Sequence, residues 1–211
     1  MKHSLGKRVC QLVIAAMAVG MCGGVASAAE FHSEAAPTGL TGEGGNPQVF
    51  TTTDTGIQVT CKKVTWEGTV VPKTAIEIDL LPTFSECSSG FLPATIKMNG
   101  CKFKITMSKV KEHHPVDIVC PAEAKAEISS MALLCPLRFG GQFAKVGVAI
   151  TNKGSGTSRD LELKFTMAGI AYDRPGCHFF GEDLDFGGST TVKGFVDKEG
   201  AHGAQVGIWV E

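Results

Sequence analysis

The densest group of carboxylates in the 211-residue chain lies in residues 181–188, which read GEDLDFGG. Glu182, Asp183 and Asp185 precede two glycines in this segment. Oxygen-rich loops of this composition bind Ca²⁺, a hard cation that takes roughly six to eight oxygen ligands. The spacing is not that of an EF-hand, so an ordinary charged loop is the competing interpretation. Calcium is the one cofactor for which the sequence offers candidate ligands, and no other cofactor is expected.

Residues that would support hydrolytic chemistry are sparse. No G-x-S-x-G elbow stands in a strand-to-helix context, and no H-E-x-x-H motif occurs. His113 and His114 follow Glu112 at an expected hairpin tip, where they would either bind a metal or form part of a solvated turn. Glu77 and Asp79 are two residues apart and so share one face of a strand, as the polar half of an alternating pattern. We therefore assign no catalytic residue.

The two tryptophans, Trp66 and Trp209, are candidate ligand-binding residues, because sugar sites stack rings on exposed aromatic side chains. Trp209 falls on the opposite parity from its apolar neighbours, and Trp66 lies near a strand end. Exposure of both on one face would indicate glycan binding. Burial would indicate a protein without such a site.

Six of the eight cysteines lie beyond the N-terminal apolar segment, and they are Cys61, Cys87, Cys101, Cys120, Cys135 and Cys177. An even number in an exported protein is typical of three disulfides. The absence of any C-x-x-C argues against a zinc site. The six residues are therefore disulfide candidates with a stabilising role.

A hairpin with Val110 and Lys111 at its tip would place Cys101 opposite Cys120. These two cysteines then bridge each other directly, or each reaches a neighbour. We favour the second pattern, since direct bridges between paired strands are the more strained geometry. That pattern pairs Cys87 with Cys101, Cys120 with Cys135, and Cys61 with Cys177.

The N-terminus carries three positive charges, an uncharged run over residues 9–25 and the small residues 26–28. This pattern predicts a secretory signal peptide over residues 1–28, cleaved after Ala28. The protein is then secreted, in the periplasm or outside the cell, with no membrane span remaining. The three charges removed, from Lys2, Lys7 and Arg8, leave 17 basic against 21 acidic residues, a formal charge of -4. With no basic cluster, nucleic-acid binding is not expected.

From residue 48 onward, apolar and polar residues alternate with period two between turn-forming clusters, which is typical of half-buried strands. The pattern predicts an all-β fold, an antiparallel β-sandwich of about ten to twelve strands braced by disulfides, with a closed β-barrel as the alternative. Only residues 122–134 have a composition that suits a helix. Residues 29–46 are expected to form an extended N-terminal arm or edge strand, and residues 47–211 a single β-sandwich domain.

The chain contains six short motifs: FHSE at 31–34, VFTT at 49–52, VTC at 59–61, MNGC at 98–101, VKG at 192–194 and QVGI at 205–208. With them the chain resembles a group of exported, cysteine-containing all-β bacterial proteins with no known activity. The resemblance implies export and an all-β fold, and it implies no catalytic residue.

Two functions fit these expectations. The first is an exported structural or interaction module of the cell envelope or extracellular space, with an unknown partner and no catalysis. The alternative is a secreted carbohydrate-binding or hydrolytic protein that uses the acidic loop.

Overall fold

The fold was analysed in a computed structural model, which describes residues 29–110, 112–145, 147–177, 179–198 and 201–211. At residues 179–182, 198 and 201 it describes the backbone and not the side chain. The expected signal peptide, residues 1–28, lies outside the described residues, and so does the expected hairpin residue Lys111.

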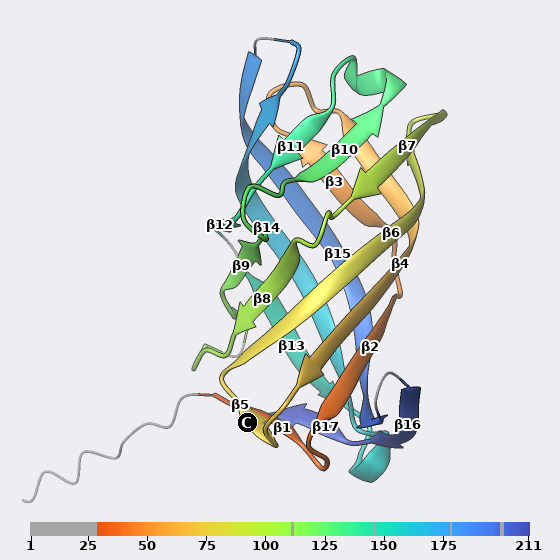
Figure 1. Ribbon diagram of the computed structural model, residues 1–211, viewed down its shortest axis with the longest axis vertical. Coiled ribbons are helices and arrows are strands. Elements are labelled where there is room, and N and C mark those ends of the chain that lie inside the picture. Colours follow the sequence, from red (N-terminus) through yellow and green to blue (C-terminus); the bar gives the residue numbers. More distant parts are fainter. Residues whose placement is uncertain (1–28, 111, 146, 178, 199–200) are drawn as a thin grey trace, which may run out of the picture.

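Strands dominate the described chain (Figure 1). The first six are β1 (Phe31–Ser33), β2 (Thr38–Gly44), β3 (Gln48–Thr52), β4 (Gln58–Val70), β5 (Thr74–Ala75) and β6 (Glu77–Ser89). There follow β7 (Leu92–Lys97), β8 (Lys102–Thr106), β9 (Val116–Val119), β10 (Ala126–Ser130), the 3-10 helix η1 (Met131–Leu133), β11 (Leu137–Phe139) and β12 (Gln142–Phe143). The last are β13 (Val148–Lys153), the 3-10 helix η2 (Gly156–Ser158), β14 (Asp160–Arg174), β15 (Phe179–Lys198), β16 (Ala201–Val206) and β17 (Ile208–Val210).

The predicted all-β, antiparallel and disulfide-braced fold is confirmed. One 14-stranded sheet contains a closed path of pairings, β4–β6–β7–β10–β11–β14–β15–β2–β4, so these strands form a ring. The described chain has 17 strands rather than ten to twelve. The excess consists of strands of two or three residues, which are too short to show an alternating pattern in the sequence.

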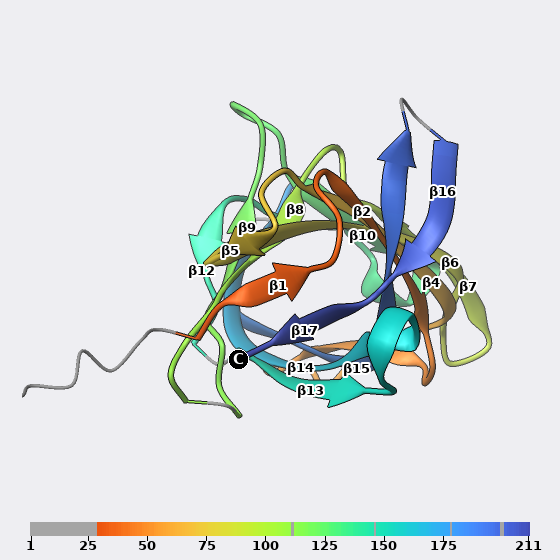
Figure 2. The same cartoon turned by 90° about the horizontal axis from the view of Figure 1, so that it is seen from below.

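A second, three-stranded sheet in the order β17-β1-β5 crosses one end of the ring, as seen from below in Figure 2. We call it the cap sheet. Phe31 of β1 and Ile208 of β17 are both fully buried in it. Asn152 ties the cap sheet to β13: its side-chain amide donates to the Val210 carbonyl and accepts from the Val210 N–H, both at 2.9 Å. The side chain thus stands in for a backbone pairing partner.

Aromatic side chains fill the space inside the ring. Trp66 of β4 stacks on Phe165 of β14 with ring centroids 4.9 Å apart, and Phe103 of β8 meets the same Phe165 at 5.9 Å. Phe50 and Phe186 add a pair at 4.6 Å. Phe50 and Phe186 are register partners on the paired strands β3 and β15, but Trp66 and Phe103 come from strands that do not neighbour β14. The aromatic cluster therefore joins opposite sides of the ring through one core.

The N-terminal arm does not form an edge. Within it, β2 pairs with β15 on one side and with β4 on the other. Gly42 makes this central position possible, since a Cβ there would lie 3.1 Å from the Trp66 side chain and 3.2 Å from that of Val192. Glycine at this position thus lets β2 pass over large neighbours.

Two further expectations are wrong. Residues 122–134 contain β10 and η1 rather than an α-helix, because Ala126 and Ile128 are buried where β10 pairs with both β7 and β11. Gly187 and Gly188 lie inside β15 rather than between strands. A Cβ at Gly188 would lie 2.0 Å from the Gln48 side chain, so glycine serves close packing there.

The six cysteines form three disulfides, and the favoured connectivity is wrong. The observed pairs are Cys61–Cys87, Cys101–Cys120 and Cys135–Cys177. Cys61 lies directly opposite Cys87 in the β4–β6 ladder. The hairpin register that placed Cys101 opposite Cys120 is correct, because β8 and β9 pair Phe103 with Ile118. Directly paired positions therefore bridge in two of the three cases.

Candidate functional site

The end of the ring opposite the cap sheet carries two loops without charge (Figure 1). Residues 87–96 hold the β6–β7 turn, and residues 128–137 hold η1, and neither segment contains Asp, Glu, Lys or Arg. The loops meet where β7 pairs with β10, and Ser130 Oγ donates to the Pro93 carbonyl at 3.2 Å. We call residues 90–93 and 131–134 the tip.

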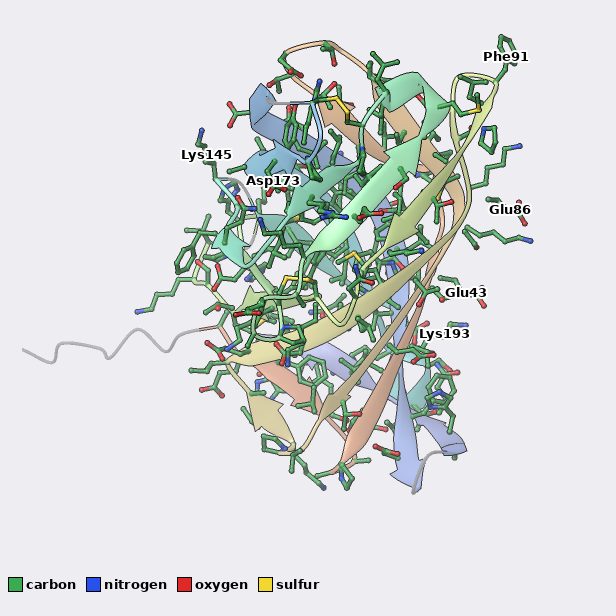
Figure 3. All side chains as sticks on the ribbon, turned by 45° about the horizontal axis from the view of Figure 1, so that its top comes forward. Glu43, Glu86, Phe91, Lys145, Asp173 and Lys193 are labelled. Carbon is green, nitrogen blue, oxygen red and sulfur yellow. A yellow bond between two sulfur atoms is a disulfide. The ribbon has the colours of Figure 1, made fainter. Side chains whose placement is uncertain are left out.

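Four apolar side chains of the tip face solvent. Phe91 is fully exposed, Leu134 is 92% exposed, Met131 is 77% exposed and Leu92 is 40% exposed. Figure 3 shows Phe91 projecting beyond the ribbon. Scattered surface apolar residues are normal, but four on two adjoining uncharged loops form a patch of the kind that marks an interaction site.

The local backbone fixes the position of each of these side chains. Ser89 pairs with Leu92, so Gly90 and Phe91 form a two-residue turn, and Gly90 supplies the positive φ of 60° that such a turn needs. Phe91 therefore sits at the apex, where no strand neighbour covers it.

Leu134 occupies an unfavourable conformation. Its φ is 58° and its ψ is -43°, and the Cys135 N–H donates to the Leu133 carbonyl at 2.5 Å, which makes Leu134 the centre of a γ-turn with positive φ. This conformation suits glycine and costs a leucine roughly 1–3 kcal/mol. The Cys135–Cys177 disulfide ties this turn to the turn between β14 and β15. An exposed leucine in a strained turn serves stability poorly, and this favours a role in contact.

Charges gather on the strands that lead into the tip, and they are Lys62, Lys63, Glu86, Lys97, Glu127 and Arg138. Glu86 pairs with Lys63, and Glu127 accepts from Arg138 Nε at 2.7 Å. The hydrogen bond from Arg138 holds the pKa of the Glu127 carboxyl below its ordinary value, against the effect of desolvation. Among the described residues, no ion pair forms at Lys62 or Lys97. The surface behind the tip therefore carries two uncompensated positive charges.

A second feature is a polar groove of about 600 Å³ on the outer surface between β2, β4, β6 and the β15–β16 hairpin. It is lined by the carboxylates of Glu67, Asp79 and Asp197, together with Lys102 and His202. Asp79 pairs with Lys102. The groove lies where the β4–β6 ladder ends, at the pair Glu67–Leu81. Such a lining suits a polar or cationic ligand.

The acidic segment is a strand rather than a loop. Leu184 and Phe186 are buried in β15, so Asp183 and Asp185 point outward between them. Asp183 Oδ1 lies 3.6 Å from Lys145 Nζ, and Asp185 Oδ1 accepts from the Gly169 N–H at 3.2 Å. The side chain of Glu182 lies outside the described residues. The carboxylates of Asp183 and Asp185 thus contact different groups and do not converge on one site.

The tryptophans do not form a sugar platform. Trp66 is fully buried in the aromatic core, so it cannot stack a ligand. Trp209 is half-buried in the cap sheet, where its ring stacks on His32 at 5.3 Å and the Arg159 guanidinium lies 4.6 Å from its centroid. Because protein groups already contact its ring, Trp209 offers no free stacking surface.

The histidines also differ from expectation. His113 is exposed, but His114 is only 1% exposed, and its Nδ1 accepts from the Ser108 N–H at 3.0 Å. His114 therefore belongs to the packed frame rather than to a solvated turn. Glu77 lies on the outer sheet surface as expected, where it pairs with Lys104 at 3.0 Å.

A polar network that the sequence did not indicate ties the β3–β4 turn to β14. Tyr172 donates its hydroxyl hydrogen to Asp54 Oδ1 at 3.0 Å, and Arg174 Nη2 donates to Asp54 Oδ2 at 3.2 Å. Burial raises the pKa of the Tyr172 hydroxyl. All three groups are engaged with one another, which indicates a structural role.

The sequence did not point to the tip, because the tip contains no reactive residue type. The signal in the sequence that could have indicated it is the absence of charged residues from 87–96 and 128–137. What the sequence could not show is that the two segments adjoin, since 31 residues separate them and only the β7–β10 pairing brings them together.

Within the part of the chain that the structure describes, no cluster of three or more His, Cys, Asp or Glu side chains is placed to hold a metal ion. The described helices include none with the length and apolarity to cross a membrane. Comparison of the chain with protein-family models, curated proteins and solved structures finds no match.

Proposed function

We propose that the protein is an exported interaction module of the cell envelope or extracellular space, and that it contacts its partner through the tip. The observation that carries this proposal is the exposure of Phe91, Met131 and Leu134 on two adjoining uncharged loops. Depletion of charge with exposed Phe, Met and Leu is the composition of an interface centre. Desolvating such a surface removes apolar area from water without stripping water from any ion.

The frame suits an exported module. Three disulfides are consistent with an oxidising compartment, and the N-terminal pattern over residues 1–28 predicts secretion. The core is filled by aromatic side chains, so the described frame holds its loops rigidly rather than enclosing a ligand.

The test is photo-cross-linking on intact producing cells. A photoreactive amino acid is placed at position 91 or 134, and at position 143 as the control, because Phe143 is 80% exposed on β12, away from the tip. We expect specific adducts from 91 and 134 and none from 143. Equal adducts at all three positions, or none from the tip, would contradict the proposal.

A secreted carbohydrate-binding or hydrolytic protein is the second candidate. The observation in its favour is the polar groove, where Glu67, Asp197 and His202 lie together, rather than the acidic segment of β15. A panel of oligosaccharides titrated against the wild type and Glu67→Gln tests it. Binding that the substitution weakens at least tenfold supports this candidate, and no binding rejects it.

A further inference from the structure

We propose that the partner of the tip is a lipid bilayer with anionic headgroups, into whose interface Phe91, Leu92, Met131 and Leu134 insert. This inference rests on the proposed function and deepens it, because it names the chemistry of the partner. The bilayer contact is peripheral.

The apolar side chains have the right arrangement for shallow insertion. Phe91 and Leu134 stand at the apices of their turns with nearly all their surface in solvent. Interfacial segments bury their apolar face roughly 5–10 Å into the boundary between headgroups and acyl chains. Because residues 90–93 and 131–134 carry no charge, no ion has to leave water when they enter.

The charges behind the tip complement anionic headgroups. Lys62 lies beside Glu86 in the β4–β6 ladder, three residues from the end of β6, and Lys97 lies five residues beyond Leu92. At about 3.3 Å per residue these distances are roughly 10 and 17 Å. Insertion by 5–10 Å brings both ammonium groups within about one Debye length of the headgroups. Each such lysine contributes about a fivefold gain in binding to an anionic membrane.

The acids on these strands do not cancel that attraction. Glu86 is paired with Lys63, and Glu127 is paired with Arg138. The remaining charges are those of Lys62 and Lys97, both exposed. The charged residues on the strands that lead into the tip are therefore net positive, four basic against two acidic, although the chain as a whole is not.

The small size of the patch favours a bilayer over a protein. A stable protein interface takes roughly 20–30 residues a side with matched shape. The tip offers four apolar side chains on two narrow turns. A bilayer demands no matched shape, and a rigid tip loses little conformational entropy on entering it. The Gly90 turn and the Cys135–Cys177 disulfide supply that rigidity.

The experiment is co-sedimentation of the protein, purified as the cell exports it, with vesicles of phosphatidylcholine alone or with phosphatidylglycerol. We expect binding to the anionic vesicles and weaker binding to the neutral ones. Phe91→Ser should weaken binding to both about tenfold, since a buried phenylalanine side chain contributes that much or more. Lys62→Ser and Lys97→Ser should each weaken binding about fivefold on anionic vesicles and leave binding to neutral ones unchanged.

Phe143→Ser is the matched control, because it removes an equally large exposed ring away from the tip, and it should bind as the wild type does. Circular dichroism and thermal melts confirm that every variant is folded. The inference is overturned if the wild type binds neither kind of vesicle, or if Phe91→Ser and Phe143→Ser lose binding equally. A single protein captured at position 91 on cells, together with no vesicle binding, would overturn the lipid inference and leave the proposed function standing.

Discussion

At the lower end of the ring in Figure 1, the cap sheet buries Phe31 and Ile208 fully, while Val71 and Ile76, on either side of β5, are 72% and 56% exposed. At the upper end, Phe91 is fully exposed and Leu134 nearly so. Both ends of the ring consist of short strands and turns that pack against neighbouring strands. The chain is thus able to cover apolar groups where stability requires it. The tip differs in that it gathers four exposed apolar side chains on two adjoining uncharged loops, which is the mark of a contact surface.

The largest expected effect is the difference in stability loss between removing a ring from the cap sheet and removing one from the tip. Phe31→Ala removes a fully buried ring from the cap sheet and should lower the free energy of unfolding by about 3–5 kcal/mol. Phe91→Ala removes a fully exposed ring and should change it by less than about 0.5 kcal/mol. Urea denaturation measures both. If Phe91→Ala lowered the free energy of unfolding by more than about 2 kcal/mol, the Phe91 ring would be packed, and the contrast between the two ends would be contradicted.

Removing the brace of the tip should have the next largest effect. The double substitution Cys135→Ser with Cys177→Ser opens a loop of 42 residues and should cost about 4 kcal/mol. The matched control is Cys101→Ser with Cys120→Ser, whose loop spans 19 residues. Loop entropy makes its loss smaller by about 0.7 kcal/mol.

Thermal melts measure both losses, and the Cys135/Cys177 double variant should be the less stable of the two. Hydrogen exchange should also show faster opening around residues 131–134 only in the first of them. Unchanged exchange there would show that the disulfide does not hold the tip.

Leu134→Gly should raise stability while it damages contact. Glycine accepts the φ of 58° without strain, so the free energy of unfolding should rise by roughly 0.5–1 kcal/mol, after the greater entropy of the unfolded chain is subtracted. The same change removes an exposed side chain from the tip, so partner binding should fall. Denaturation and binding measured on one preparation test this opposition. A stabilised variant with full binding would remove Leu134 from the contact surface.

The smallest effect concerns the charges behind the tip. Because Arg138 lowers the pKa of Glu127, ionised Glu127 stabilises the fold above its ordinary pKa of 4.5, and this contribution is lost as pH falls through the lower, folded-state value. Glu127→Gln should therefore cost about 0.5 kcal/mol at pH 7 and nothing in acid. Stability curves over pH 2–8 measure the difference.

Asp117, on β9 away from the tip, is the control with the opposite sign. Burial raises its pKa, so its contribution is present below the ordinary value of 3.8 and lost as pH rises. Asp117→Asn should then be neutral or slightly stabilising at pH 7. Destabilisation by both substitutions at pH 7 would contradict the assigned causes.

The sequence was sufficient for the features that depend on local pattern. Alternation of apolar and polar residues predicted an all-β fold, and a hairpin argument correctly placed Cys101 opposite Cys120. Features that depend on contacts between distant segments were not predictable. Ala126 and Ile128 have helix-compatible neighbours, but β10 is drawn into the sheet by strands on both sides. The cysteine pairs follow from strand order, which periodicity does not give.

The candidate site shows the same limit. Reactive residue types drew attention to Asp183, Asp185, Trp66 and His114, and the structure engages each of them in the frame. The tip has no reactive residue. Its character comes from exposure, and exposure is set by where strands end rather than by the local sequence.

The most direct test of the account is the depth of the tip in a membrane. A fluorescent amino acid is placed at position 91, or at position 143 as the control, and its emission is recorded with anionic vesicles that contain quenchers at known depths in the lipid. The account predicts a blue shift and quenching by shallow acyl-chain quenchers at position 91, with no change at position 143. Fluorescence at position 91 that stays water-like with every vesicle would contradict it.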